Sequence, residues 1–437
     1  MSNVTLPDNW KTVSLGSLGR FFRGQGGTRS DESDNGLPCI RYGDIYTHHD
    51  CIVKNFCSAI EPDRASSYTP LQTGDVIFAG SGETFEEIGK AAAYCGQEKA
   101  YAGGDTLIFR PSSSLDPYFA GYAVNSDYAN KNKARLGQGS SVIHISAEHL
   151  ASIPLQLPPI NQQQSIAATL QTIDRAIAHT EALIEKYQQI KSGLMHDLFT
   201  RGIGADGKLR SPREEAPELY QESAIGWIPK DWNCMPIKQY VKSAQYGIST
   251  SLSDEEVGIP VLRMNNIQEN SFDVSDIKYT SNLDADNLKI KNGDVLYNRT
   301  NSIEHVGKTA IWRGELSECS FASYLVRINL HDDMILPHFF SYWMSQVSSQ
   351  NALRRYATPG VQQVNINPTN LQKILISCPH DLEEQRRIVI RIDGIELKLQ
   401  TEKTTLNKLH KAKAGLMNDL LTGKVPVNVD ADEEDHG

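Results

Sequence analysis

The sequence predicts an α+β protein in which two mixed α/β domains are joined by two long helices. These helices are expected to pair as an antiparallel coiled coil about an internal pseudo-two-fold axis. Three observations predict this fold: the chain repeats itself at an offset near 222 residues, each copy opens with short apolar runs between polar loops, and each copy ends in a long heptad stripe. At 437 residues the chain is also too long for one ordinary core.

The repeat is clearest at the end of each copy. KSGLMHDLFTRG at residues 191–202 returns as KAGLMNDLLTGK at residues 413–424. The same offset relates Trp10 to Trp232, and slips of a few residues occur only inside the copies. The chain therefore consists of two copies of one unit of about 200 residues, rather than a solenoid of short repeats.

The globular parts are expected at residues 1–157 and 226–378. In the first, apolar runs at 38–42, 75–79 and 106–109 alternate with Gly, Ser and Asn clusters, which is typical of strands and loops. We expect one helix in each part, starting at Asp116-Pro117 and at Pro337, because proline suits a first helical turn.

The long helices are expected at residues 158–200 and 379–422. Their core positions follow alternating steps of four and three residues: Ile166, Leu170, Ile173, Ile177, Thr180, Ile184, Tyr187, Lys191, Leu194 and Leu198, then Ile388, Ile392, Ile395, Leu399, Glu402, Leu406, Leu409, Lys413, Leu416 and Leu420. Both stripes have polar breaks at the same two places. A helix of about 38 residues is about 57 Å long, so each stripe needs a long partner, and the other copy supplies one. A generic dimerisation coiled coil remains the alternative.

Residues 201–225 are expected to form an exposed linker because glycine and proline recur there, and residues 423–437 an acidic tail. The net charge of -10 is awkward for a protein that binds nucleic acid. Five acidic residues of the last eight account for half of it, which leaves about -5 for the folded part. Any basic surface must then be local, or partner proteins must supply it.

Composition also limits the setting in which the protein works. No apolar run approaches the roughly 18 residues of a membrane span, and the opening MSNVTLPDNW has no signal-peptide character, so a cytoplasmic protein without membrane contact is expected. Seven scattered cysteines without a C-x-x-C pair indicate reduced thiols and no zinc module.

A search for catalytic motifs finds no credible site. Two G-x-G stretches do not complete G-x-G-x-x-G, and Walker A, H-E-x-x-H and G-x-S-x-G motifs are missing. Asp116-Pro117-Tyr118 lacks the second proline of an adenine methyltransferase motif, and the one E-x-K of a nuclease type lies inside a long helix. His48-His49 is expected to be a solvated pair rather than a metal site. We therefore predict no catalytic and no metal-binding residue.

Polar loops at matching places in the two copies indicate surface recognition instead. GSGETFEE at 80–87 corresponds to NRTNSIEH at 298–305, and LGQGSSVIHI at 136–145 corresponds to TPGVQQVNI at 358–366. Arg, Asn and Gln side chains can pair with base edges through two hydrogen bonds. The copies agree in framework residues and differ in these loops, as two readers of different DNA sequences should.

These features together resemble the specificity subunit of a Type I restriction-modification system, over nearly the whole chain. The residues that carry the resemblance are GLMHDLFTRGI and GLMNDLLTGKV, IPKDW, GDVLYNRTNS, VGKTA, and the helix starts LPPINQQQSIAATL and CPHDLEEQRRIVI. One departure is Gln162, where the second copy keeps the usual acidic residue, Glu384.

The resemblance implies a non-catalytic subunit whose two target-recognition domains each read one half of a bipartite, asymmetric site in double-stranded DNA. It implies as partners two modification subunits, which are adenine-N6 methyltransferases, and restriction subunits that translocate DNA. S-adenosylmethionine, ATP and Mg are then expected in the partners and no cofactor in this chain. The coiled coil would dock the modification subunits and set the spacer between the half-sites.

The candidate DNA contacts come from the matched loops, with three basic residues as candidate phosphate contacts. The base-reading candidates are Ser81, Thr84, Gln138 and Ser140 in the first copy and Arg299, Asn301, Gln362 and Gln363 in the second. The phosphate candidates are Arg23, Lys90 and Lys308. Arg41 and Arg263 occupy equivalent framework positions and are assigned to structure. A pseudo-symmetric protein scaffold without DNA readout and an enzyme with an unrecognised site remain the rival hypotheses.

Overall fold

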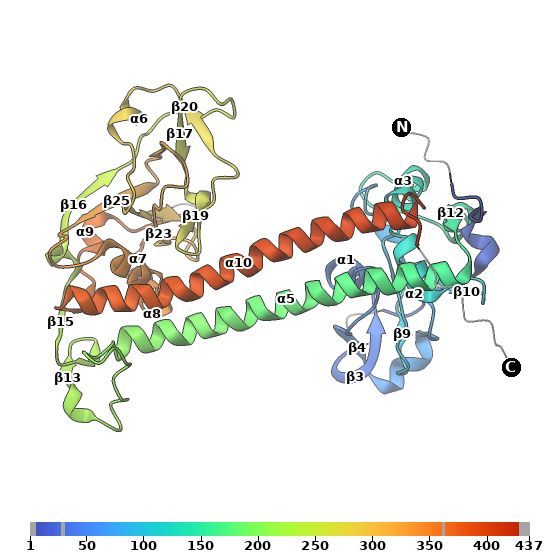
Figure 1. The fold of residues 1–437 in the computed structure, drawn as a ribbon, viewed down its shortest axis with the longest axis horizontal. Helices are drawn as coiled ribbons and strands as arrows, with labels where there is room; N and C mark the ends of the chain where they lie inside the picture. The colour runs from blue at the N-terminus through green and yellow to red at the C-terminus, as the bar shows by residue number, and fades with distance from the viewer. Residues whose placement is uncertain (1–5, 28–30, 361–362, 428–437) are drawn as a thin grey trace. The chain divides into compact units, whose positions relative to one another are not determined.

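The computed structural model describes residues 6–27, 31–360 and 363–427, and the chain divides into two compact units (Figure 1). The first unit comprises residues 1–182 and 403–437, and the second comprises residues 183–402. Each unit therefore contains one globular part, the beginning of that copy's long helix and the end of the other copy's long helix.

The first unit is built from short strands and short helices that precede one long helix. Its strands are β1 (Lys11–Ser14), β2 (Gly19–Arg23), β3 (Glu32–Ile40), β4 (Ser58–Ile60), β5 (Thr69–Pro70), β6 (Val76–Ala79), β7 (Ser81–Gly82), β8 (Ala91–Ala93), β9 (Tyr101–Ala102), β10 (Thr106–Pro111), β11 (Ile143–His144) and β12 (Pro154–Leu157). Its helices are α1 (Tyr42–Thr47), α2 (Pro117–Ala123), α3 (Asp127–Leu136), α4 (Ala147–Ser152) and the first part of α5 (Ile160–Thr200).

The second unit repeats this plan after an additional hairpin. Its strands are β13 (Tyr220–Ser223), β14 (Gly226–Pro229), β15 (Trp232–Pro236), β16 (Val241–Tyr246), β17 (Ile259–Leu262), β18 (Ile267–Gln268), β19 (Ser271–Phe272), β20 (Lys278–Thr280), β21 (Val295–Asn298), β22 (Thr300–Asn301), β23 (Thr309–Ile311), β24 (Ser320–Phe321), β25 (Leu325–Leu330), β26 (Thr358–Pro359), β27 (Val364–Asn365) and β28 (Leu375–Pro379). Its helices are α6 (Asp284–Asn287), α7 (Pro337–Ser345), α8 (Val347–Arg354), α9 (Pro368–Leu371) and the first part of α10 (Leu382–Leu421).

The central sheets of the two units have the same topology. The order β2-β10-β6-β8 in the first matches β16-β25-β21-β23 in the second, and every neighbouring pair is antiparallel. A second sheet in each unit contains one parallel pair, β3 with β9 and β17 with β24. The pairs β1–β12 and β15–β28 then close each globular part just before its long helix. These matching registers confirm the internal repeat and the mixed α/β class.

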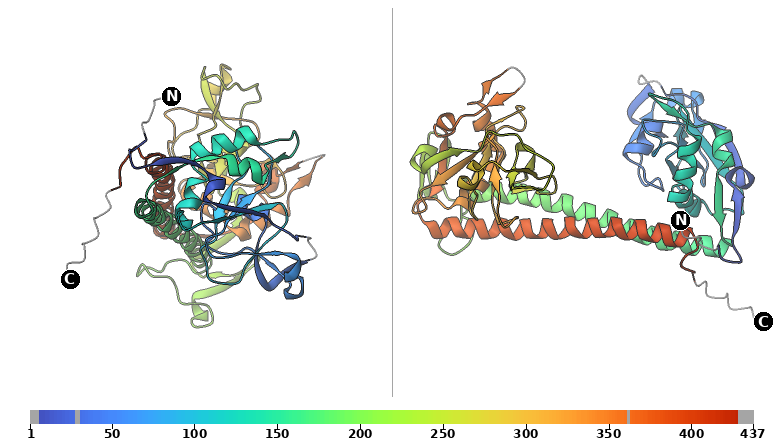
Figure 2. Two further views of the ribbon diagram at one scale, coloured as in Figure 1. Left: turned by 90° about the vertical axis from the view of Figure 1, so that its right-hand side faces the viewer. Right: turned by 90° about the horizontal axis from the view of Figure 1, so that it is seen from above.

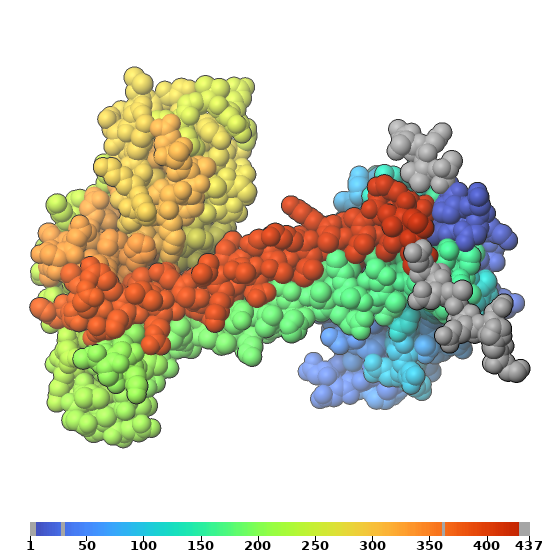
Figure 3. Space-filling model, in the orientation of Figure 1, coloured from blue at the N-terminus to red at the C-terminus, as the bar shows by residue number. Residues whose placement is uncertain are grey.

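The two long helices, α5 with 41 residues and α10 with 40, form an antiparallel coiled coil. In each unit the beginning of one helix lies beside the end of the other (Figures 2 and 3). Apolar stripe positions such as Ile166, Leu170, Ile388 and Ile392 are fully buried, as the heptad pattern predicts.

The polar break at Lys191 and Lys413 is explained by two reciprocal ion pairs across the coil. Nζ of Lys413 lies 2.7 Å from Oδ1 of Asp174, and Nζ of Lys191 lies 2.5 Å from Oε1 of Glu396. Asp174 and Glu396 are themselves 222 positions apart, so each lysine meets the acid of the opposite copy. The two units therefore make the same contact with the roles of α5 and α10 exchanged, and within each unit it fixes the register of the two helices.

Each repeated dodecapeptide completes the core of the other copy's globular part. Leu420 and Leu421 pack in the first core, which also holds Trp10 and Phe119, whereas Met195, Leu198 and Phe199 pack in the second. The pair of segments that marks the repeat in the sequence is therefore where the copies interlock.

Two expectations are wrong in detail. Each globular part contains several short helices besides the predicted ones at Pro117 and Pro337, because segments such as α3 and α4 are too short to give a clear helical period. Residues 201–225 are not an exposed linker: Ile203, Ala216 and Tyr220 are buried, and β13 pairs with β14. Among the described residues, no helix is long and apolar enough to cross a membrane.

Candidate nucleic-acid interface

In each unit, a pair of short strands at the equivalent position of the fold holds several of the candidate recognition residues. In the first unit β7 pairs with β11, and Oγ of Ser81 lies 2.9 Å from Nδ1 of His144 across the strands. In the second unit β22 pairs with β27, and Nδ2 of Asn365 donates to Oγ1 of Thr300 at 2.9 Å. The same framework thus presents a hydroxyl with an imidazole in one unit and a hydroxyl with an amide in the other.

In the first unit three of the predicted residues come together. Arg23, Ser81 and Gln138 line one hollow of about 230 Å³, together with His144 and His149. Gln138 is held there by backbone hydrogen bonds with His144 in both directions, at 2.9 and 2.7 Å. The hollow therefore combines a positive charge with several donors and acceptors, the chemistry that base edges and phosphates require.

The β7 strand is fixed from behind by Tyr46. Its hydroxyl donates to the carbonyl oxygen of Ser81 at 3.0 Å. Burial, assisted by the negative charge of Glu87, raises the pKa of Tyr46 to about 12, so the hydroxyl keeps its proton at neutral pH. The position of Ser81 is therefore set by the scaffold rather than by a flexible loop.

In the second unit two contacts hold the side chain of the candidate residue Arg299. Its Nε donates to the carbonyl oxygen of Ser323 at 3.1 Å, and its guanidinium lies 5.0 Å from the ring centre of Tyr246. Those contacts hold the side chain while the two Nη nitrogens remain as a fork of donors. Asn301 follows on β22, and its Oδ1 accepts from the amide of Ser302 at 2.8 Å.

The remaining candidates lie in other surroundings. Thr84 lies in an exposed loop with Glu83, Glu86 and Glu87 and donates to Glu87 at 3.3 Å. Ser140 and Gln363 are exposed near the tips of their loops, and Gln362 lies outside the described residues. Lys90 donates to the carbonyl oxygen of Tyr46 at 3.3 Å. Lys308 lines a separate, larger cavity near the long helices.

Sequence reasoning did not select His144, Asn365 or Tyr246. His144 and Asn365 belong to loops that the repeat comparison identified, but their importance depends on which strand lies opposite. The strand pairing shows the match: Ser81 pairs with His144 as Thr300 pairs with Asn365, so both copies carry a hydroxyl and a polar partner. The loop alignment of 80–87 with 298–305 places Ser81 one residue away from this register. Tyr246 is exposed at the end of β16, where Arg23 ends β2 in the first unit.

The first recognition loops, at 80–87 and 298–305, are each followed by a turn that a side chain of α3 or α8 holds in place. Nζ of Lys133 donates to the carbonyl oxygen of Gly89 at 2.7 Å, whereas Nε2 of Gln350 donates to Gly307 at 2.9 Å in the second unit. Both glycines have positive φ, 70° and 85°, which favours glycine. The first unit thus uses a buried amine where the second uses a neutral amide.

Burial lowers the pKa of Lys133 to about 7 from its usual 10.5. The unfolded chain therefore binds more protons between these values, and the free energy of unfolding should rise with pH across that window. Lys133→Met removes this titration, so it should gain stability relative to the wild type as pH falls from 10 to 7, by several kcal/mol at about 1.4 kcal/mol per pKa unit. Denaturant unfolding at pH 7, 8 and 9 measures the difference, with the exposed Lys131→Met as control. Parallel pH profiles for Lys133→Met and wild type would contradict the assignment.

In each unit a tryptophan of the globular part donates a hydrogen bond to the start of the long helix. Nε1 of Trp10 donates to Oε1 of Gln162 at 2.9 Å, and Nε1 of Trp232 donates to Oε1 of Glu384 at 3.1 Å. The departure at Gln162 therefore preserves the hydrogen bond. It loses the charge, and in the described part of the first unit no arginine bonds to Gln162 as Arg210 bonds to Glu384.

Arg210 binds Glu384 through two hydrogen bonds in the second unit. Nη1 and Nη2 lie 2.6 and 2.9 Å from the two carboxylate oxygens, and both side chains are less than 10% exposed. Glu384 also accepts from the backbone amide of Ile203 at 2.9 Å. This cluster anchors the segment after α5 to the start of α10, which is why that segment is packed rather than exposed.

Two further observations concern chemistry. In the part of the chain that the structure describes, no three His, Cys, Asp or Glu side chains gather as a metal site would require. His49 is buried rather than solvated, and burial lowers its pKa. The expectation of a solvated histidine pair is therefore wrong for this residue, whose backbone amide donates to the carbonyl oxygen of Asp44 in α1.

A family model described as the Type I restriction modification DNA specificity domain matches residues 7–189 and again residues 229–411. Among related proteins, the MjaVIII specificity subunit of Methanocaldococcus jannaschii is 23% identical over 98% of this chain and 95% of its own length. The EcoKI specificity subunit of Escherichia coli is 22% identical over 90% of this chain and 84% of its own. The MjaX specificity subunit is 26% identical, and that match spans 47% of this chain and about half, 49%, of the relative.

Solved structures agree on the fold. The S subunit of a Type I restriction-modification system from M. genitalium superposes with a TM-score of 0.59 at 13% identity, covering 96% of this chain and 98% of its own. A chain from a study of complex assembly in the type I R-M system gives 0.53 at 17% identity, covering 96% and 100%. Both confirm the architecture of two globular parts with two long helices.

Proposed function

Because the chain belongs to the family of Type I restriction-modification DNA specificity subunits, we propose that its two globular parts read the two halves of one bipartite, asymmetric DNA site. The first would read through Arg23, Ser81, Gln138 and His144, and the second through Arg299 and the residues around it. Membership of the family shows that DNA recognition is the role of the chain. The assignment of the two half-sites to these residues is our proposal.

The observation that carries the proposal is that the two units share one framework of strands but have different side chains in their recognition loops. The cross-strand pair is Ser81 with His144 in one unit and Thr300 with Asn365 in the other, although the strands beneath them have the same register. Hydroxyls, amides and imidazoles read different donor and acceptor patterns in the major groove. Two domains that recognise different half-sites need this combination of the same strand framework and different side chains in the recognition loops.

The chain's own residues would bind the DNA site and position it for the partner subunits, without catalysing a reaction. Methylation at adenine N6 and DNA translocation would be performed by two modification subunits and by restriction subunits, which would hold S-adenosylmethionine, ATP and Mg. The overall negative charge fits this division, because partners that close around the DNA can supply phosphate contacts. A scaffold that never touches DNA would not need unlike tips on like frameworks.

The coiled coil would set the spacer between half-sites. Inserting four residues at equivalent points of α5 and α10 should lengthen the spacer, since four residues add about 6 Å and base pairs are stacked at about 3.4 Å. Mapping methylated adenines in cells that express the chain with its modification subunit measures this directly. Substituting four exposed residues at the same points is the control. An unchanged spacer in the insertion variant would contradict the ruler, and methylation without any bipartite motif would contradict the proposed function.

A further inference from the structure

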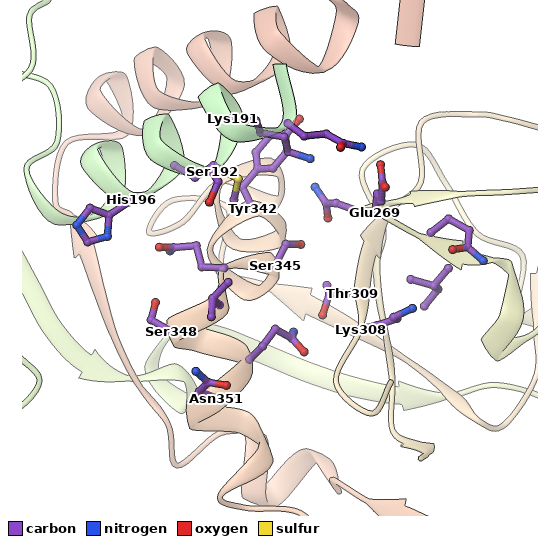
Figure 4. Close-up of a pocket in the computed structure, with 18 of the residues that line it drawn as sticks. Lys191, Ser192, His196, Glu269, Lys308, Thr309, Tyr342, Ser345, Ser348 and Asn351 are labelled. Carbon is purple, nitrogen blue, oxygen red and sulfur yellow. The ribbon is translucent and has the colours of Figure 1, made fainter. Parts of the chain in front are cut away.

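The second unit contains a cavity of about 1060 Å³ that the DNA-reading loops do not use (Figure 4). Lys191, Ser192 and His196 of α5 form one side of it, and Tyr342, Ser345, Ser348 and Asn351 of α7 and α8 form another. Glu269 lies on the turn between β18 and β19, and Lys308 follows the first recognition loop. The cavity therefore lies between the end of α5 and the residues that follow the recognition loop at 298–305.

One wall of the cavity carries an unused buried donor. Asn270 is 5% exposed, and Nδ2 of its side chain has no hydrogen-bond partner among the described residues. The rest of the residue is fixed: its Oδ1 accepts from the hydroxyl of Ser341, and its carbonyl oxygen accepts from Nη1 of Arg313 at 3.1 Å. A buried amide donor without a partner is costly, so this position is suited to an acceptor supplied from outside.

A second wall carries an uncapped helix N-terminus. Helix α8 begins after Gln346, whose side chain makes no capping hydrogen bond, and Gln346, Val347 and Ser348 all line the cavity. The first intrahelical bond is donated by Gln350 to Gln346, so the preceding amides of the first turn point outward as donors. In the first unit the equivalent helix α3 is capped, because Oγ of Ser126 accepts from Ala129 at 3.2 Å. The N-terminal charge of α8 therefore remains available for an anionic group.

The equivalent place in the first unit is occupied by the chain itself. There Lys413 binds Asp174 across the coil and also Asp50 from the globular part, so a carboxylate bridges globular part and helix. In the second unit Lys191 has its coil partner, Glu396, and the structure gives it no second acid among the described residues. A carboxylate in the cavity would restore in the second unit the contact that Asp50 makes in the first.

We propose that this cavity binds a carboxylate-bearing polypeptide segment of the modification subunit, an inference that rests on the proposed function. The carboxylate accepts hydrogen bonds from Nδ2 of Asn270 and from the first-turn amides of α8. The cavity lies at the upper end of the range for small-molecule pockets, about 1,000 Å³, which leaves room for a peptide segment. Amide side chains such as Gln188 and Gln268 on its walls suit a peptide backbone. Glu269 and Glu304 offset Lys308 and Arg354 on the same walls, so the cavity is not the continuous basic surface that a DNA phosphate backbone requires, whereas a single carboxylate needs only local donors.

The inference predicts that the two modification subunits bind unequally. Asn270→Asp keeps the shape and the acceptor for Ser341 but places a negative charge opposite the carboxylate, so one of the two copies should bind at least about tenfold more weakly. Gln346→Ser supplies the cap that Ser126 provides in α3, so it should raise the thermal midpoint and yet weaken the same copy by competing for the amides. Greater stability with weaker binding is an outcome that a merely structural role would not give.

The experiment titrates the purified full chain with its cognate modification subunit and counts both binding steps by calorimetry and sedimentation. Asn282→Asp is the matched control, because it adds the same charge to a half-buried residue of the same unit outside the cavity, whose Oδ1 already accepts from the backbone amide of Asp284. Wild-type affinity for both copies in both cavity variants would overturn the inference.

Weakened binding of a random-sequence duplex alone, with both copies of the modification subunit still bound normally, would assign the cavity to DNA phosphate and overturn it as well. If the unaltered chain binds no modification subunit at all, the proposed function fails and takes the inference with it.

Discussion

Arg210→Met should lower the free energy of unfolding of the second unit by about 3–5 kcal/mol, because it leaves the buried carboxylate of Glu384 without its cation. The loss is large since the guanidinium also donates to the backbone oxygen of Arg201 at 3.0 Å and to Asp231 at 2.8 Å. One substitution therefore loosens the end of α5, the packed segment after it and the start of α10. Denaturant unfolding followed by tryptophan fluorescence measures the effect, since Trp232 contacts the same carboxylate.

The double variant Arg210→Met with Glu384→Gln should recover most of that stability. It recreates the neutral arrangement of Trp10 with Gln162, and replacing a whole buried ion pair by uncharged groups is often close to neutral. Arg386→Met is the control, because Arg386 pairs with Glu383 in solvent on the same helix, where such pairs contribute about 0–1 kcal/mol. If Arg210→Met costs no more than Arg386→Met, the cluster does not anchor the segment.

Arg299→Ala should relax recognition at one half-site while leaving the other unchanged. An arginine fork on a guanine edge discriminates by about 1–3 kcal/mol, which corresponds to a loss of on the order of 10- to 100-fold in preference for the correct base. Arg299→Lys should not restore it, because an ammonium cannot make two parallel hydrogen bonds. Selection of bound sequences from a randomised duplex pool, with the modification subunit present, measures preference at each position.

The matched control for Arg299 is Arg213→Ala. Arg213 also lies over an aromatic ring in the second unit, 4.0 Å from the ring centre of Trp227, but it belongs to the hairpin segment rather than to a recognition loop. Loss of preference with Arg213→Ala, or an unchanged motif with Arg299→Ala, would move base reading away from the end of β21.

The repeat and the helices could be predicted from the sequence because their signals are local and periodic. A stripe such as Ile166, Leu170, Ile173 and Ile177 needs no knowledge of its partner to be read as one helix face. The breaks at Lys191 and Lys413 were visible, but their cause was not. An ion pair between Lys413 and Asp174 joins residues far apart in the chain, and only the antiparallel register brings them together.

The packed segment at 201–225 was missed for the same reason. Glycines and prolines favour turns, and turns are commonly exposed, but Arg210 and Glu384 lie 174 positions apart and no local pattern links them. Long-range contacts of this kind keep the segment packed although its composition favours an exposed loop. Its glycines allow tight turns instead, and Gly202 and Gly207 have positive φ.

The candidate recognition loops could be selected from the sequence, whereas the side-chain pairs across their strands could not. Charge and polarity selected Arg299, Arg23 and Gln138, which the structure places on the frameworks described above. His144 and Asn365 were missed because each acts through the residue opposite it, and strand pairing is not encoded in residue type. Thr84 stays a prediction, and the three glutamates beside it place negative charge next to its hydroxyl.

The interlocked helix ends also determine the order in which the molecule can be completed during synthesis. The second unit lies wholly between residues 183 and 402, so it can close as soon as its last turn has been made. The first unit contains the residues made first, yet its core needs Leu420 and Leu421. Until those arrive, the core that holds Ile166 and Leu170 of α5 lacks the apolar side chains that α10 supplies. We therefore expect the first unit, although it is translated first, to be completed after the second.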